Sequence, residues 1–442
     1  MTIKLSDHFT YKKLLRFTLP SIVMMIFTSI YGVVDGFFVS NFAGKEAFTA
    51  VNFIWPFVMV LGAVGFMFGS GGSALISKTL GEGEHKKANK LFALFVYLTV
   101  LCGIVIGVGG TFLVRPIAKL LGAEGEMLEL SVRYGKILLC ALPMYMLQFE
   151  FQSLFVTAEK PQMGLWVTIG AGCTNIALDA LLVGVFHWGV AGAAAATALS
   201  QTVGGVVPLF YFFSKNTSLL RLGRTSFDGK ALWKACTNGS SELLSQISMS
   251  LVAMLYNAQL MRYEPENGVA AYGVLMYVNM VFLSVFIGYS VGTAPVIGYH
   301  YGAQNYAELK SLMKKSLVII GVTSIVMFVG AELLSKPFAH IFVAYDEALF
   351  TLTLRAFFVF SFSFLFCGFG ILGSSFFTAL NNGFASALIS FLRTVVFQVG
   401  AVLLLPLVIG SDGIWGSVVV GELLALLVTV LLLICYRKRY KY

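Results

Sequence analysis

Charged residues are scarce in this chain: Asp, Glu, Lys and Arg make up 12% of its 442 residues. An average soluble domain carries about 25%, and it needs that charge to cover its surface. Hydrophobic residues supply 58% of the chain, and the mean hydropathy is +0.86. The composition therefore excludes an ordinary soluble protein and predicts an integral membrane protein whose apolar surface faces lipid.

Metal-binding and catalytic patterns are also missing. The six cysteines show no CxxC spacing, and none of the five histidines is spaced with a partner residue. A thiol inside an apolar run usually packs as a small hydrophobic side chain. We therefore expect no disulfide, no metal cluster, no cofactor and no enzymatic activity.

Long apolar runs dominate what is present. A spanning helix needs about 20 mostly apolar residues, and twelve segments qualify. They cover residues 14–40, 50–77, 91–114, 130–157, 163–186, 189–213, 234–261, 269–298, 312–334, 348–379, 384–409 and 413–436. The prediction is an all-α integral membrane protein with about 12 transmembrane helices, several of them kinked at Gly, Pro or Ser.

Basic residues divide unequally between the loops on the two sides of the membrane. Of the 30 Lys and Arg residues, 21 fall on the side of the N-terminus, eight fall on the other side, and Arg393 lies within a span. Because positive residues favour the cytoplasmic side, both termini are predicted to be cytoplasmic, in a multi-pass protein of the cell membrane. The net charge of +9 then reflects topology and contact with membrane lipid, and no nucleic-acid partner is expected.

The chain repeats itself at a shift of 221 residues. Gly81 falls on Gly302, each followed by a polar segment, and Phe155 falls on Phe376. Coincidences of this kind recur in order along several loops. The chain is therefore predicted to consist of two six-helix repeats, related by a pseudo-two-fold axis along the membrane normal.

This repeat divides the chain into four parts. Residues 1–213 form an N-terminal six-helix lobe, 214–233 a basic cytoplasmic linker, 234–436 a C-terminal six-helix lobe, and 437–442 a basic cytoplasmic tail. Transporters of this construction bind their substrate between the repeats and rock one against the other. A channel or a receptor is the alternative from a different class.

One group of polar residues within the spans could bind an ion. Asn175 and Asp179 are four residues apart, which places them on one face of a helix. Asp179 precedes the turn after its span by about eight residues, and Thr197 follows that turn by a similar number, so both lie roughly 12 Å below it. Asp35 reaches a similar depth. Four oxygen groups from three helices suit a hard cation, and two adjacent carboxylates could instead hold a proton. A purely structural polar cluster is the alternative.

Other charged groups within the spans are candidates too, since intramembrane charge is costly. Glu242 and Arg393 lie at equal depth from the cytoplasmic side, which permits a buried ion pair, with a structural role favoured over substrate contact. Glu150 and Glu422 could line an aqueous cavity. Pro20 removes a backbone donor low in the first helix and predicts a place where that helix bends.

These residues carry a resemblance to a known family. Pro20 with Asp35 fifteen residues later, the Asn175-x3-Asp179 pair, Thr197 and the six-plus-six halves resemble the multidrug and toxic compound extrusion (MATE) family. The segments LPSIVMMIFTSIYGVVDGFFVS and GSSELLSQISMSLVAMLYNAQL are similar to family helices 1 and 7.

The resemblance implies a function. Members export organic, often cationic and lipophilic, compounds in exchange for sodium ions or protons, and one branch holds the cation in the N-terminal lobe. Carried over, that site falls on Asp35, Asn175, Asp179 and Thr197. Another branch uses carboxylates on helices 7 and 10, but helix 10 here has none beyond its outer end.

We therefore expect a multidrug efflux antiporter coupled to Na⁺, H⁺ or both, acting as a monomer on a small organic substrate. A lipid-linked oligosaccharide flippase of the same superfamily is the nearest alternative. A predominance of Arg and Lys facing the cavity would favour it.

Overall fold

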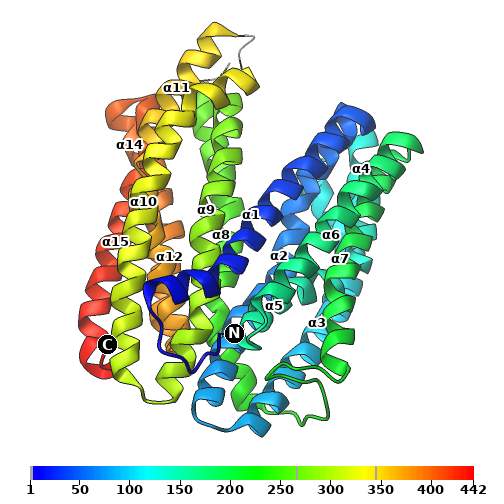
Figure 1. Cartoon of the computed structure of the whole chain (residues 1–442). Helices are drawn as coiled ribbons and strands as arrows, with labels where there is room; N and C mark the ends of the chain where they lie inside the picture. Colours follow the sequence, from blue (N-terminus) through cyan, green and yellow to red (C-terminus); the bar gives the residue numbers. More distant parts are fainter. Residues whose placement is uncertain (1–2, 265–266, 344–345) are drawn as a thin grey trace.

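The structure is a computed structural model that describes residues 3–264, 267–343 and 346–442. All regular secondary structure within these ranges is helical (Figure 1). The helices form twelve columns, as predicted. Nine columns are single helices that are long and apolar enough to cross a membrane, and two more are pairs of helices bent at a short break. The twelfth is α8 (Gly229–Tyr263), which has 35 residues but a more polar sequence.

The N-terminal half holds the first six columns, two of which end in a π-helical turn. They are α1 (Tyr11–Phe38) with η1 (Val39–Ala43), α2 (Lys45–Gly81), α3 (His85–Leu120), α4 (Gly125–Cys140) with α5 (Leu142–Thr157), α6 (Pro161–Leu178) with η2 (Asp179–Val185), and α7 (Gly189–Phe213).

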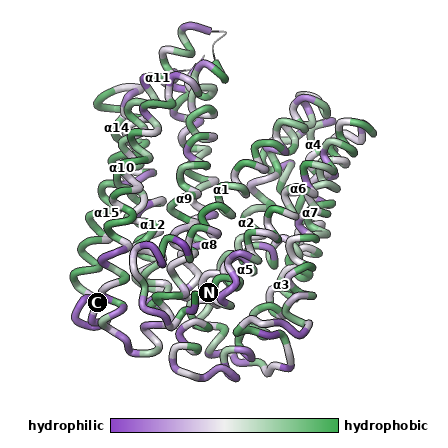
Figure 2. The backbone as a smooth tube through the Cα atoms, in the orientation of Figure 1, coloured by the Kyte–Doolittle hydropathy of each residue, from purple (hydrophilic) through white to green (hydrophobic). Residues whose placement is uncertain are grey.

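The C-terminal half follows the same order. Its columns are α8, α9 (Gly268–Gly302), α10 (Tyr306–Val343), α11 (Glu347–Ser361) with α12 (Phe364–Ala379), α13 (Gly383–Phe391) with η3 (Leu392–Gln398) and α14 (Val399–Ile409), and α15 (Ser411–Tyr440). Exposed aliphatic and aromatic side chains cover the outside of both halves. Hydrophilic residues gather at the ends of the bundle and in its loops (Figure 2).

Backbone geometry confirms the internal repeat. The fourth column bends by 59° at Ala141, and the tenth bends by 47° at Phe362 and Ser363, about 221 residues later. Turns match as well: Glu159 and Asn381 follow equivalent helices, and both adopt left-handed conformations, with φ of 60° and 57°. Helices thus bend and end at equivalent places in the two halves.

The two halves contact each other near the face that carries both termini, which we call the terminal face, and they diverge toward the opposite face (Figure 1). The contact is made by α1 against α9 and by α2 against α8. A Cβ atom added to Gly71 would lie 2.0 Å from the Ala235 carbonyl oxygen, and one added to Gly288 would lie 2.5 Å from the Ile22 Cα. Only glycine allows these backbones to approach so closely.

The segment before α1 connects the two halves. Leu5 and Phe9 are fully buried. The Leu5 amide donates to Glu159 Oε1 in the N-terminal half (2.6 Å), and the Phe9 amide donates to Glu308 Oε1 in the C-terminal half (2.9 Å). The other oxygen of Glu308 lies 2.6 Å from His8 Nδ1. Residues 3–10 therefore act as a strap across the terminal face.

The segment between the halves is shorter than the predicted linker, because α8 begins at Gly229. The Asp228 side chain accepts hydrogen bonds from the amides of residues 230 and 231, and so caps this helix. The remaining linker lies against α3, where the Arg221 amide donates to Asn89 Oδ1 at 2.7 Å. At the other end, α15 continues to Tyr440 through most of the predicted tail.

Candidate functional site

The four residues predicted to form an ion site come together in the N-terminal half. Asp35 lies on α1 and Thr197 on α7, and the Thr197 hydroxyl donates to Asp35 Oδ1 over a long 3.5 Å. The side chains of Asn175 and Asp179, at the end of α6, also lie within interaction range of Asp35. Three helices therefore present two carboxyl groups, an amide and a hydroxyl to one place.

The local helix geometry explains how α6 contributes two groups. Asn175 and Asp179 are separated by one helical turn, and Asp179 begins the π-helical segment η2. In the same way, α1 passes into the π-helical segment η1 four residues after Asp35, and η1 contacts η2. Single π-helical turns are frequent at functional sites, and they shift the side chains that follow them.

The side-chain oxygens of Asn175 and Asp179 are buried and unsatisfied. Asp179 is 0% exposed and Asn175 is 1% exposed. Among the described residues, neither carboxylate oxygen of Asp179 nor Oδ1 of Asn175 has a hydrogen-bond partner. An ionised carboxylate buried without a partner is very costly. The arrangement is therefore suited to a small hard cation bound by these oxygens or to a proton carried by a carboxyl group.

Sequence reasoning missed a fourth helix at this site. Tyr134, on α4, is fully buried and lies beside Asp35, Asp179 and Thr197. Its hydroxyl adds another polar group to the cluster. Tyrosine is common in membrane helices, so nothing in the pattern of the sequence marked this one.

The C-terminal half has a neutral counterpart of the Asp35–Thr197 contact. The repeat places Tyr256 on α8 where Asp35 lies on α1. The Tyr256 hydroxyl lies 2.5 Å from Ser417 Oγ on α15, the helix equivalent to α7. Both side chains are buried. The equivalent helix pairs are thus joined differently. Two hydroxyl groups join α8 to α15, whereas a carboxyl and a hydroxyl group join α1 to α7.

The predicted Glu242–Arg393 ion pair is wrong. Arg393 Nε lies 2.9 and 2.8 Å from the two oxygens of Glu422, and Nη2 lies 2.8 Å from Oε1. Equal depth in the membrane did not predict which carboxylate Arg393 contacts. Arg393 belongs to the π-helical segment η3, which packs against α15 and faces Glu422. Glu242 on α8 is a more distant, partly exposed neighbour.

Glu150 and Glu422, which from the sequence could have lined an aqueous cavity, are both buried in this structure. Glu422 is 3% exposed and holds Arg393. Glu150, on α5, is 0% exposed, and neither of its oxygens has a hydrogen-bond partner among the described residues. Pro20 lies within α1, which passes through it as one helix. The predicted bending of α1 at Pro20 stays a prediction.

Comparison with known proteins finds a matching family model and relatives along most of the chain. The family model described as MatE matches residues 20–181 and 243–403, which is one match in each half. The multidrug export protein MepA of Staphylococcus aureus strain MRSA252 is 23% identical over 431 residues, covering 97% of this chain and 94% of the relative. MepA of Staphylococcus haemolyticus strain JCSC1435 is 27% identical over 319 residues, covering 72% and 69%.

Solved structures show the same fold. A multidrug resistance MATE family transporter in an outward-facing conformation superposes with a TM-score of 0.92 at 23% identity, over 98% of each chain. A MOP superfamily transporter from Pyrococcus furiosus Vc1, described as having a binding pocket of reverse polarity, superposes with a TM-score of 0.91 at 24% identity, over 98% of each chain. Because the family model matches most of each repeat and well over half of the chain, this chain belongs to the multidrug and toxic compound extrusion family of transporters.

Proposed function

We propose that this chain is a secondary active antiporter that exports organic, cationic and lipophilic compounds in exchange for sodium ions or protons. It would work by alternating access in the cell membrane, as a monomer with both termini in the cytoplasm. The observation that carries this proposal is the pair Asp35 and Asp179, in which the buried Asp179 has both carboxylate oxygens without a hydrogen-bond partner among the described residues. Relatives named as multidrug exporters support the choice of cargo.

Helix α1 contributes both to the ion site and to the contact between the halves. Asp35 lies near one end of α1, while Thr18 and Ile22, near the other end, pack against Gly292 and Gly288 of α9. Filling the site neutralises Asp35 and changes how α1 packs against α6 and α7. Because the same helix contributes to the contact with the other half, ion binding can bias the equilibrium between the two access states.

The paired state of Arg393 weighs against the flippase alternative. A flippase of this superfamily would use uncompensated cations facing a central cavity. Arg393 is instead neutralised by Glu422 in a bidentate pair and is mostly buried, with 17% of its side chain exposed. It is thus better placed to hold η3 against α15 than to bind an anionic lipid carrier.

The test measures uptake of a fluorescent lipophilic cation into inverted vesicles, with sodium and proton gradients imposed separately. Asp35→Asn and Asp179→Asn remove charge with little change of shape, and Glu126→Gln on the exposed first turn of α4 is the control. A typical coupling free energy is about 1–3 kcal/mol, so gradient-driven uptake should fall about tenfold or more in the two Asp variants and stay unchanged in the control. Substrate binding should persist in both. Wild-type uptake by both Asp variants would show that the cluster is structural.

A further inference from the structure

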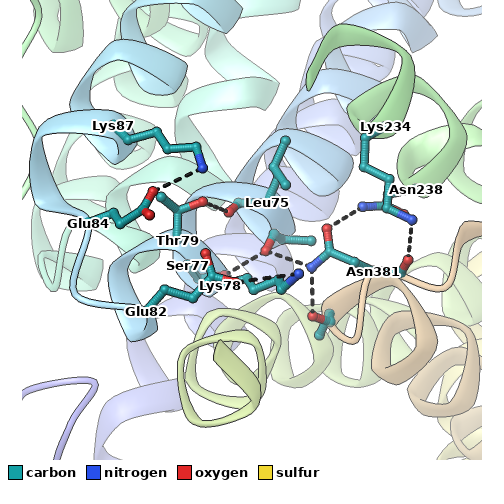
Figure 3. A network of polar contacts seen from close by, with 12 residues as sticks. Leu75, Ser77, Lys78, Thr79, Glu82, Glu84, Lys87, Lys234, Asn238 and Asn381 are labelled. Carbon is teal, nitrogen blue, oxygen red and sulfur yellow. Dashed lines mark hydrogen bonds and ion pairs between the residues drawn. The ribbon is translucent and has the colours of Figure 1, made fainter. Parts of the chain in front are cut away.

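Three basic side chains from both halves gather at the terminal face. Lys78 is on α2 in the N-terminal half, while Lys234 on α8 and Arg439 on α15 belong to the C-terminal half. Lys234 lies close enough to Lys78 and Arg439 for its positive charge to be repelled by theirs. Figure 3 shows Lys78 and Lys234 on neighbouring helices on either side of Asn381. We call Lys78, Lys234 and Arg439 the basic cluster.

Hydrogen bonds around Asn381 hold one side of this cluster in place. The Lys234 ammonium donates to the Asn381 carbonyl oxygen at 2.6 Å, and Asn238 Nδ2 donates to Asn381 Oδ1 at 2.6 Å (Figure 3). Asn381 Nδ2 in turn donates to the carbonyl oxygen of Ala74, one turn before Lys78 on α2, at 3.1 Å. The position of Lys234 is therefore tied to the helix that carries Lys78.

An aromatic pair holds the other side. Lys78 Nζ lies 5.8 Å from the ring centre of Tyr301, and Arg439 Cζ lies 5.5 Å from that of Tyr440. The two rings are themselves 5.6 Å apart in an edge-to-face arrangement. Lys78 and Arg439 thus flank a single pair of tyrosines, and attraction to these rings favours positions of the two cations beside them.

The charge of the cluster is incompletely balanced. Glu82 lies 3.5 Å from Lys78, and both side chains are about one-third exposed. Among the described residues, neither Lys234 nor Arg439 forms an ion pair with a carboxylate. Three cations against one carboxylate attract an anion with more than one negatively charged or acceptor oxygen, for which phosphate is a suitable group.

Neighbouring aromatic side chains favour a lipid over a soluble anion. Trp233 precedes Lys234 and is 73% exposed, and Phe384 on α13 is 72% exposed. Both lie within about one turn of the contact between α13 and α8, where a Cβ added to Gly383 would be 2.1 Å from the Thr237 carbonyl oxygen. Exposed aromatic residues at the ends of spanning helices mark the headgroup level of the bilayer.

We propose that the basic cluster binds the phosphate of an anionic phospholipid whose acyl chains lie beside Trp233 and Phe384. Because the cations come from both halves, one bound headgroup holds α2 against α8 and α15. It therefore favours the arrangement in which the halves are in contact at the terminal face. This inference does not rest on the proposed antiport, since the bound lipid is neither the exported compound nor the coupling ion.

Retention of phosphatidylglycerol by the purified protein, measured by native mass spectrometry after exchange from mixed phosphatidylcholine and phosphatidylglycerol nanodiscs, tests the site. The combined variant Lys78→Gln, Lys234→Gln, Arg439→Gln should retain about tenfold less phosphatidylglycerol than the wild type. The control Lys86→Gln, Lys87→Gln, Lys90→Gln removes the same charge from α3 alone and should retain it fully. Equal retention by the two variants overturns the proposal. So does displacement of the lipid by millimolar inorganic phosphate, because the site would then serve a free anion.

A second measurement examines the contact between the halves. Spin labels at Glu84→Cys and Lys310→Cys, in a chain whose native cysteines are replaced by serine, report the distance across the terminal face. Phosphatidylglycerol should increase the share of the short distance in the wild type and leave it unchanged in the cluster variant. An equal response of both proteins contradicts the bridging role of the cluster.

Discussion

Gly81 and Gly302, which the internal repeat makes equivalent, make reciprocal contacts between the two halves. A Cβ atom added to Gly81 would lie 2.0 Å from the carbonyl oxygen of Tyr299, and one added to Gly302 would lie 2.0 Å from that of Lys78. Tyr299 and Lys78 are also equivalent in the repeat. The pseudo-two-fold axis therefore passes through this crossing of α2 and α9, where there is room only for hydrogen atoms.

Gly302→Ala should force these helices apart. Overpacking of this kind typically costs about 1–3 kcal/mol, so the variant should shift the protein away from the state described here. Labels across the terminal face should report a longer distance. Gly273→Ala, on the same helix, is the matched control, because its Cβ would meet nothing within 4 Å. If the label distance increased as much in Gly273→Ala as in Gly302→Ala, the effect would be unrelated to the crossing of α2 and α9.

A double-mutant cycle tests the Arg393–Glu422 pair. Removing one member leaves a buried charge unpaired, at a cost of about 3–5 kcal/mol, whereas Arg393→Met combined with Glu422→Leu should recover part of the folded yield lost in each single variant. Glu242→Gln should cost about 1 kcal/mol or less, since Arg393 keeps its partner. Chemical denaturation in detergent provides the measurement. Coupling of Arg393 to Glu242 with none to Glu422 would restore the original prediction.

Loosening the strap should expose the N-terminal segment. Glu308→Ala removes the acceptor of the Phe9 amide and the partner of His8, and a lost hydrogen bond to a charged group costs about 1.5–3 kcal/mol. Amide exchange across residues 3–10 should then be at least about tenfold faster by hydrogen–deuterium exchange mass spectrometry. Glu84→Gln, whose side chain faces solvent and pairs with Lys87, should leave it unchanged. Unaltered exchange in Glu308→Ala would mean that other contacts hold the segment.

The positive-inside asymmetry predicts that the terminal face is cytoplasmic. A cysteine placed at Ser226 in the linker should react with a membrane-impermeant reagent in inverted vesicles but not in intact cells. A cysteine at Glu126, on the opposite face, should show the reverse pattern. The reactive native cysteines are replaced first. Labelling of the linker from outside the cell would reverse the topology, and with it the direction of export.

The spans and the repeat were predictable because lipid imposes a simple rule over long stretches of sequence. Each span needs a run of apolar residues, and turns between spans need residues that tolerate special backbone angles. Glu159 and Asn381 occupy such positions 222 residues apart. The pairing of Asn175 with Asp179 could also be predicted from the sequence, because a four-residue spacing on a helix places two side chains on one face.

Pairing across helices was not predictable from depth alone. Arg393 lies in a π-helical segment, which rotates the following side chains relative to a regular helix. Which neighbour it faces depends on how α15 packs against η3, and no periodic pattern records that packing. The same reason explains why Tyr134 was missed and why the sequence left open whether Glu150 faces water or is enclosed. The rotation of a helix about its own axis depends on tertiary contacts, whereas the apolar pattern of the sequence predicts only where the helix begins and ends.

The strap also constrains the order in which the protein can assemble. Leu5 bonds to a residue 154 positions later, and Phe9 bonds to one 299 positions later. During synthesis the N-terminal segment can therefore contact Glu159 once the fifth column begins, but it must wait for α10 before it can contact Glu308. Contacts of such long sequence separation form late, because a long stretch of chain must first be ordered. The segment before α1 is thus made earlier than both of its partners, and it can complete its contacts only after parts of both halves have folded.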